Sequence, residues 1–238
     1  LMIGLAHGVE GVRIDAHLAD GKALRDMLSE VNPEMISLHV DGYETVGALR
    51  AVVNWAGEAR VDMRGSSTWD LGRELPQDDP SKFLRHVEAW NTAFPKFSTW
   101  GVDASVWQDR GMLPIDAIAL SINAAKWGIQ TLMSSGQTII QAASRCTIRL
   151  ASTTDIISTA AAIRGLRVAF ATMIEDLGCD PESAPLWIES RTTSIFGVSD
   201  FIEDNLLRHT IMAYGAIMGG ADGIEVRRHD FISPSGDD

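Results

Sequence analysis

Hydrophobic and polar positions along this chain follow two periods, which alternate from one end to the other. Apolar residues recur at every second position in short segments such as 11–15 and 35–40, and this period is typical of half-buried strands. They recur every three or four positions in the segments that follow, 20–31 and 45–55, and this period is typical of amphipathic helices. The pattern therefore predicts that strand and helix follow one another in turn.

The alternation is clearest over residues 97–177, where strand, helix, strand and helix succeed one another. Residues 97–108 are rich in Trp, Val and Thr, which suit a pleated surface. Pro114 and Asp116 suit the first turn of a helix. We expect that helix to bury one apolar face, made of Ile115, Ile118, Ala119, Ile122 and Ile129.

The second strand and helix of this stretch carry equally clear signals. Residues 146–151 form the predicted strand, and Thr154 or Asp155 can cap the helix that follows. Gly178 ends that helix. Its predicted buried stripe consists of Ile163, Leu166, Phe170, Met173, Ile174 and Leu177.

The whole chain contains seven such β/α alternations, which indicate a parallel sheet wrapped by helices. The predicted strands are 11–15, 35–40, 60–64, 146–151, 186–190 and 223–227, together with one inside 97–108, a segment that also includes the loop after it. The predicted fold is α/β, a (β/α)8 TIM-barrel-like parallel barrel. A closed barrel has eight strands, so either the pattern misses one strand or one lies outside the given chain. We expect one domain over 1–232, a polar loop over 66–80 and a tail or linker over 233–238.

Composition limits the classes of function. The formal net charge of −12 argues against non-specific nucleic-acid binding, which needs a basic surface. We expect no membrane span, because no apolar run approaches the roughly 20 residues that a span needs.

Cys146 and Cys179 lack the spacing of a zinc site or a redox pair, so we expect reduced thiols and a cytoplasmic protein. Because the chain begins at Leu1, we expect it to be part of a longer polypeptide.

Polar residues that follow the predicted strands are the candidates for chemistry, because barrel active sites lie at the carboxyl ends of strands. For each residue alone, an ordinary hydrogen-bonded surface position is the alternative, and only convergence favours a site. Phosphate-binding loops, nucleophile elbows and His-Glu-x-x-His pairs are missing from the sequence. The candidates are Asp15, His17, Asp41, Tyr43, Arg64, Trp107, Gln108, Ser152, Glu189, Arg191, Arg227, Arg228, His229 and Asp230.

One segment invites comparison with a cobalamin-binding motif, Asp-x-His-x-x-Gly. Asp15 and His17 have the right spacing, but Gly21 comes one place late. The other glycine and serine signals of a cobalamin domain are not found at their distances. We therefore do not assign His17 as a cobalamin ligand, and we interpret Gly219-Gly220 as the end of a helix.

Several short segments, in one order, resemble the acyl-CoA-binding barrel domain of the methylmalonyl-CoA mutase family. The order and spacing match over roughly residues 94–230, and the part before Ser81 looks closer to the small, non-catalytic subunit of heterodimeric bacterial enzymes. The resemblance implies a (β/α)8 barrel that admits the pantetheine arm of coenzyme A. It also implies a radical carbon-skeleton rearrangement that depends on adenosylcobalamin in a separate domain. The matching segments are 95–108, Gly111, 163–167, 205–208, Gly219-Gly220 and Asp230.

The chain departs from this family at the positions that matter for catalysis. The family's tyrosine and histidine match Trp107 and Gln108, which supply neither a phenol nor an imidazole. Glu225 stands where the catalytic subunit tends to have a histidine, and no histidine occurs over 189–194. We therefore predict no catalytic residue and no metal ligand. The candidate substrate-binding residues at the family's pocket positions are Trp107, Gln108, Glu189, Arg191 and Glu225.

The resemblance leads to a first hypothesis and two rivals. The chain is first interpreted as a small, non-catalytic, stabilising subunit of an acyl-CoA isomerase, paired with a catalytic mutase subunit or a second copy of itself. In that case adenosylcobalamin belongs to the assembly. The second hypothesis is a competent variant mutase that acts on a different acyl-CoA, with a cobalamin domain supplied elsewhere. The third is an unrelated barrel enzyme that uses Asp15, Arg64 and Glu189.

Overall fold

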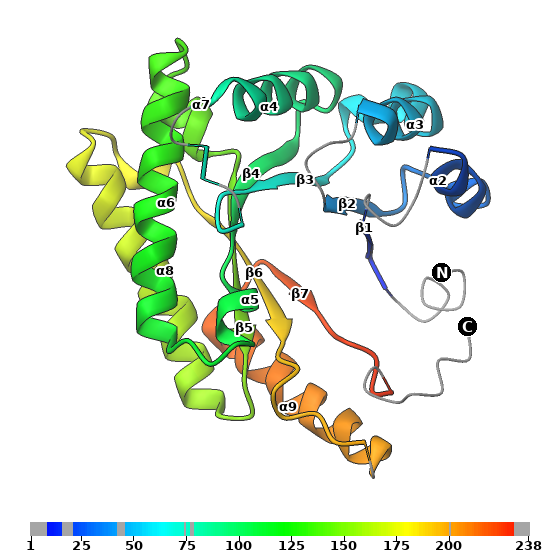
Figure 1. Ribbon diagram of the computed structural model, residues 1–238, viewed down its shortest axis with the longest axis vertical. Coiled ribbons are helices and arrows are strands. Elements are labelled where there is room, and N and C mark those ends of the chain that lie inside the picture. The colour runs from blue at the N-terminus through cyan, green and yellow to red at the C-terminus, as the bar shows by residue number, and fades with distance from the viewer. Residues whose placement is uncertain are drawn as a thin grey trace. The chain divides into compact units, whose positions relative to one another are not determined.

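A computed structural model describes residues 9–15, 21–41, 46–73, 75–76, 79–199 and 201–230. It divides the chain into two compact units, residues 1–101 and 102–238. Strands and helices alternate through both units (Figure 1), and the strands are ordered as in the sequence. The seven described strands pair in parallel wherever their registers are defined, which confirms the α/β class and agrees with an incomplete TIM-like barrel. The predicted tail, 233–238, lies outside the described residues.

The first unit carries four strands in parallel register, with a helix after each of the first three. The apolar side chains Val12, Leu38 and Val40 point from the strands toward Ala51 and Val52 of a helix, and all five are buried. The strands are β1 (Gly11–Asp15), β2 (Ser37–Asp41), β3 (Gly65–Asp70) and the start of β4 (Phe97–Asp103). The helices are α2 (Gly21–Leu28), α3 (Val46–Ala56) and α4 (Ser81–Ala93).

The third strand lies further along the chain than predicted. Residues 57–61, next to the predicted strand 60–64, form the 3₁₀ helix η1 (Gly57–Val61), and β3 begins at Gly65. The predicted loop 66–80 is therefore wrong at its start. The segment was misassigned because β3 is polar: Ser66 is buried, and its hydroxyl is 2.9 Å from His39 Nδ1 on β2. Gly65 is required, since a Cβ there would lie 1.9 Å from the Leu38 carbonyl oxygen.

A buried aromatic cluster joins α4 to β3 and β4. His86 lies among these rings, with its ring centre 5.7 Å from that of Trp69. Its Nε2 lies 2.7 Å from the Ser67 carbonyl oxygen, so the neutral ring can donate a hydrogen bond there. Burial lowers the pKa of His86, because the apolar surroundings disfavour the charged ring. The cluster consists of Trp69, Phe83, His86, Trp90, Phe94, Phe97 and Trp100.

The second unit continues the alternation with longer helices. Two of its helix ends follow the predicted signals: Asp155 accepts a hydrogen bond from Ser158 N at 3.0 Å, and Gly220 ends a helix in the left-handed conformation. The strands are the end of β4, β5 (Cys146–Ser152), β6 (Trp187–Thr192) and β7 (Gly223–Glu225). The helical segments are α5 (Ser105–Gln108), α6 (Pro114–Ser134), α7 (Ile139–Ala143), α8 (Ile156–Asp176), η2 (Pro181–Ser183) and α9 (Ile202–Gly219).

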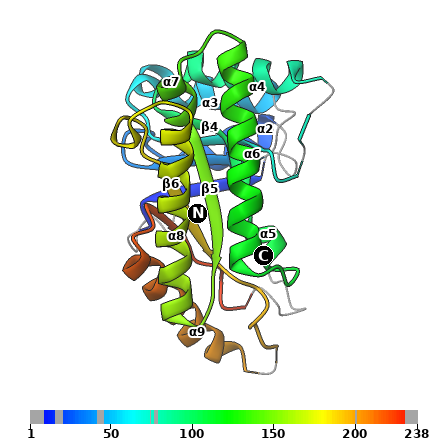
Figure 2. The same ribbon diagram turned by 90° about the vertical axis from the view of Figure 1, so that its left-hand side faces the viewer.

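The buried face of α6 differs from the predicted one. Ile115 is 72% exposed, and among the predicted residues only Ile129 is fully buried. Both faces repeat at helical spacing, so periodicity alone could not choose between them. Small side chains decide the choice, because they let α6 lie close beside α8 and β5 (Figure 2). The buried face consists of Ala117, Ser121, Ala125, Gly128, Ile129 and Leu132.

By length and composition α8 could cross a membrane, contrary to the expectation that no segment approaches that limit. The helix is partly buried in the second unit, and two of its arginines bond to the end of α9. Arg164 Nη2 donates to the Met218 carbonyl oxygen at 2.8 Å, and Arg167 Nη2 donates to that of Gly220 at 2.7 Å. The predicted stripe is buried from Ile163 to Ile174, with Leu177 half-buried. The helix is thus held within the unit at the end of α9.

Two glycines let α8 and α9 pack closely. A Cβ at Gly219 would lie 2.9 Å from Ile163 Cβ, and a Cβ at Gly215 would lie 3.2 Å from Thr159 Cβ. The two glycines are four positions apart on α9, so they lie on one face of the helix. A side chain at Gly219 requires the helices to move apart.

We expect Gly219→Ala to lower the free energy of unfolding by about 1–3 kcal/mol, because the added methyl overpacks the α8–α9 contact. Gly165→Ala is the matched control, since a Cβ at Gly165 meets nothing within 4 Å. The control should gain about 0.5–1 kcal/mol from its better helix propensity. Urea unfolding followed by circular dichroism measures both variants. Equal stability of the two would contradict the close contact.

His86 should make stability fall in mild acid. Its pKa in the folded chain lies below the ordinary value of about 6.5, so below that pH the unfolded chain binds a proton that the folded chain does not. Stability should therefore be full above about pH 6.5 and decline as the pH falls below it. Urea midpoints at pH 7.5 and 5.5 should differ less in His86→Gln than in the parent. An unchanged difference would show that His86 does not contribute.

Candidate functional site

The strands of the second unit have an apolar face and a charged face. On β5 and β6, the apolar residues Ile148, Leu150 and Ile188 are buried on the side of the helices. The alternate residues point the other way, toward what is the interior in a β/α barrel. Arg149 pairs in register with Glu189, and Ala151 pairs with Arg191, which in turn pairs with Glu225. Charged side chains on three strands thus meet on one face.

Arg149 lies at the centre of these charges. Its Nη1 is 2.8 Å from Asp103 Oδ2, at the end of β4. Its Nε and Nη2 are 2.9 and 2.8 Å from Glu189 Oε2. All three side chains are at most 11% exposed, so each ionic contact is made almost out of water. Buried charges of this kind are tolerated only when they are paired.

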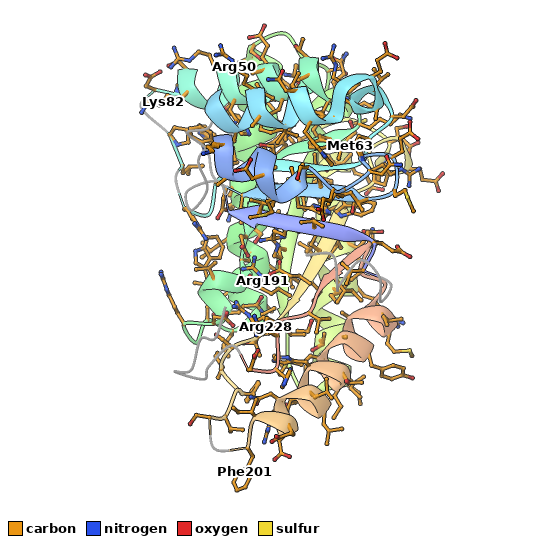
Figure 3. All side chains as sticks on the ribbon, turned by 90° about the vertical axis from the view of Figure 1, so that its right-hand side faces the viewer. Arg50, Met63, Lys82, Arg191, Phe201 and Arg228 are labelled. Carbon is orange, nitrogen blue, oxygen red and sulfur yellow. The ribbon has the colours of Figure 1, made fainter. Side chains whose placement is uncertain are left out.

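Arg191 extends the pairing to a third carboxylate. Its Nη1 is 3.3 Å from Asp103 Oδ2, and its Nε is 2.9 Å from Glu225 Oε1. Figure 3 labels Arg191 among the side chains of this unit. Carboxylates and guanidinium groups therefore alternate along a row of contacts, which we call the ionic chain. Its members, in order, are Glu189, Arg149, Asp103, Arg191 and Glu225. Three carboxylates and two guanidinium groups hold the face together by mutual attraction.

The side chain of Gln108 makes the next hydrogen bond to β5 beyond the end of β4. β4 ends at Asp103, and Ala104 N makes the last backbone bond to β5, 3.0 Å to the Arg149 carbonyl oxygen. The next β5 donor, Ala151 N, bonds to Gln108 Oε1 at 2.7 Å. Gln108 is 6% exposed, and Trp107 beside it on α5 is half-buried. The amide oxygen of Gln108 is thus already used within the fold.

A second cluster ties together the loops that follow β6 and β7. Asp109 accepts hydrogen bonds from Thr193 Oγ1 and, at 3.1 Å, from Ser194 N. Arg227 Nη2 donates to Asp109 Oδ2 at 3.0 Å, and Arg227 N donates to Thr192 Oγ1 at 2.9 Å. The segment after β4 is therefore fixed to the ends of two later strands.

Three of the predicted candidates, Glu189, Arg191 and Glu225, are brought together in the ionic chain. Gln108 and Trp107 lie on α5 beside the end of β5. Whether these five residues bind a substrate stays a prediction. What the contacts establish is that each charged member pairs with a neighbouring side chain of opposite charge.

Other predicted rim residues lie elsewhere. Ser152 is the last residue of β5, but it is fully buried and its Oγ contacts Ser190 Oγ. Arg64 precedes β3, so it does not lie at the carboxyl end of a strand. Arg228 pairs with Asp230 at the surface. Asp41, in the first unit, pairs with Arg13 at 2.7 Å. His17 and Tyr43 lie outside the described residues, as does the side chain of Asp15.

Sequence reasoning missed Asp103, Arg149 and Asp109. A signal for Arg149 was available, because it stands alone among apolar residues of a strand that was predicted to be buried. A charged residue at such a position needs a buried partner of opposite charge. That partner could have been sought on the neighbouring strands.

The remaining titratable groups of this unit belong to its packing. Burial raises the pKa of the Cys146 thiol on β5, so the thiol stays protonated and unreactive. Burial also lowers the pKa of His209 on α9. Within the ranges that the structure describes, no three His, Cys, Asp or Glu side chains converge as metal ligands.

We expect Arg149→Met to lower the free energy of unfolding by about 3–5 kcal/mol, because it leaves Asp103 and Glu189 buried without their shared cation. Removing one acid as well, in Arg149→Met with Glu189→Leu, should recover part of the loss. Chemical denaturation of the single and double variants measures the coupling. Additive losses would contradict the ionic chain. Lys96→Met, at an exposed ion pair, is the control and should change little.

Comparison with known protein families gives one match. Residues 76–233 match the family described as "Methylmalonyl-CoA mutase". The match covers the end of the first unit and, up to residue 233, the second, including the ionic chain and the Gln108 contact.

The most similar curated proteins include small subunits from two bacterial genera. A "Probable methylmalonyl-CoA mutase small subunit" of Mycobacterium tuberculosis (strain ATCC 25618 / H37Rv) is 30% identical over 135 residues, 57% of this chain and 22% of the relative. The "Methylmalonyl-CoA mutase small subunit" of Propionibacterium freudenreichii subsp. shermanii is 26% identical over 246 residues, 94% of this chain. The chain spans only 37% of that second protein's length.

Proposed function

Because the chain belongs to the methylmalonyl-CoA mutase family and is homologous to its small subunits, we propose that it is a non-catalytic scaffold for a catalytic mutase subunit. In this role it stabilises the partner through a protein interface and carries out no isomerisation itself. The single observation that carries the proposal is the ionic chain. It occupies, with paired and buried charges, the strand face on which a barrel enzyme would receive a ligand.

The ionic chain argues against a pantetheine arm at this face. A ligand placed between Arg149 and its acids would have to replace charge-assisted hydrogen bonds of 2.8–2.9 Å with weaker contacts of an uncharged chain. Asp103 and Glu189 would then lose the buried cation that they share, and such a loss costs several kcal/mol. Binding of acyl-CoA on this face would therefore require the network to be rebuilt.

Gln108 and Trp107 support the same proposal. If they match the family's catalytic histidine and tyrosine, as the resemblance implies, neither provides the acid group of its counterpart. The Gln108 amide oxygen also bonds to Ala151 N, so this side chain supports β5. The described residues therefore offer no fit for adenosylcobalamin chemistry. In the proposed assembly this cofactor is bound by the partner.

The proposed partner is a large, catalytic methylmalonyl-CoA mutase subunit, since the relatives are named small subunits. The proposed location is the cytoplasm. Cys146 and Cys179 are both free, as expected in a reducing compartment. The apolar helix α8 is held by side-chain bonds to α9, which supports a core role for it.

Calorimetric titration tests the proposal. The purified chain should show no saturable heat with methylmalonyl-CoA or adenosylcobalamin, and it should bind a candidate large subunit with a Kd below about 1 µM. Saturable binding of both small ligands by the chain alone, with turnover of the acyl-CoA, would contradict the scaffold role. That result would favour a competent variant mutase.

A further inference from the structure

The helix α9 is apolar on its outer side as well as on its buried side. From His209 to Gly219 it contains no Asp, Glu, Lys or Arg. Soluble helices normally place charged residues on the face that is turned to water. The exposed apolar residues, which we call the α9 face, are Leu206, Leu207, Ile211, Tyr214, Ile217 and Met218, each 40–66% exposed.

The α9 face points away from the rest of its unit. At about 100° per residue, Gly215 and Gly219 lie on the side that packs against α8. Leu207, Tyr214 and Met218 lie roughly opposite the buried residues of the helix. A neighbouring helix of the same layer would cover the flank of α9, but these three side chains face outward. Packing within one barrel does not account for them.

The α9 face is large enough for a stable interface. Together with Phe201, which is 67% exposed at the start of the helix (Figure 3), it presents on the order of 700 Å². The largest apolar patch on an ordinary monomer is about 300–600 Å². A standard protein interface covers about 800 Å² on each partner. One further chain seated on α9 would therefore bury an area of the usual size.

The charges at the ends of α9 select the kind of partner. Glu203 and Asp204 lie exposed in its first turn, and its one Lys or Arg residue, Arg208, is already 4.0 Å from Asp204. If a second copy packed antiparallel, the acidic first turn of one α9 would lie beside the C-terminal end of the other α9. That end has the negative pole of the helix dipole and no basic residue in its last turn, so the two would repel. Two copies would also bring together net charges of −12. A partner with basic residues beside its apolar helix avoids both costs.

We infer that the α9 face is the docking surface for a different protein chain, which presents an apolar helix with a basic residue opposite Glu203 and Asp204. This inference rests on the proposed function, because it takes that chain to be the large mutase subunit. The central contacts are made by Leu207 and Tyr214. The acidic turn sets the direction of the partner helix.

Variants on α9 test this surface against a purified candidate large subunit. Leu207→Glu and Tyr214→Glu should each weaken the complex about thirtyfold or more, since each buries a charge at the centre of the interface. Val168→Glu is the matched control, because Val168 is a similarly exposed apolar residue, 67% exposed, on α8. The control should bind as the parent does. Circular dichroism and thermal unfolding of the free chains establish that all three are folded.

The charge selection has its own test. Glu203→Gln should weaken binding about threefold and reduce its dependence on salt, because it removes one half of an ionic contact across the interface. If binding changes neither with salt nor with this substitution, the inference that the partner has a basic residue at this contact is wrong.

The outcomes separate this inference from the proposed function. If the parent and the variants bind the large subunit equally, the proposed partner is supported, but the α9 face is not the surface that binds it. If the parent does not bind the large subunit and remains a monomer, both are wrong. If sedimentation shows a homodimer that Leu207→Glu dissociates, a second copy occupies the face and the inferred partner is overturned.

Discussion

The burial of Arg149 in β5 is the constraint on which the second unit depends. A guanidinium group in this position must find carboxylates on both sides, and the parallel register supplies them from β6 and from the end of β4. Arg191, which also pairs with Asp103, in turn pairs with Glu225 on β7. Strands that are far apart in the sequence are therefore held in one register by charge as well as by backbone bonds. An apolar filling of the same space would not specify that register so narrowly.

Much of the fold could be predicted from the spacing of apolar residues and from the residues that cap helices. The exceptions have physical causes. Asp155 and Gly220 marked helix ends correctly, because capping is a local property of the chain. β3 was placed too early because it buries polar residues, such as Ser66 beside His39, and a hydrophobic pattern does not detect these. The face of α6 was wrong because small residues pack best there, and their neighbours lie far away in the sequence.

The candidate site could be predicted only in part for a related reason. Glu189 and Arg191 were found because they lie near the end of a predicted strand, where chemistry is expected, and Glu225 was found through the family resemblance. Their partners Asp103 and Arg149 are defined by register between strands, and register is a property of the folded sheet. Sequence could therefore name some of the charged residues but could not show that they pair with one another. That difference separates a pocket of reactive groups from a closed network.

The bond from Gln108 to Ala151 has a consequence for the history of such a chain. A residue that also supports a strand cannot be exchanged without cost, whatever group stood there in an ancestor. Replacing Gln108 by a side chain without such an oxygen would leave Ala151 N without this acceptor, and so it would weaken the sheet. The side chain at position 108 is therefore retained by the fold itself, and exchanging it requires a compensating change beside β5.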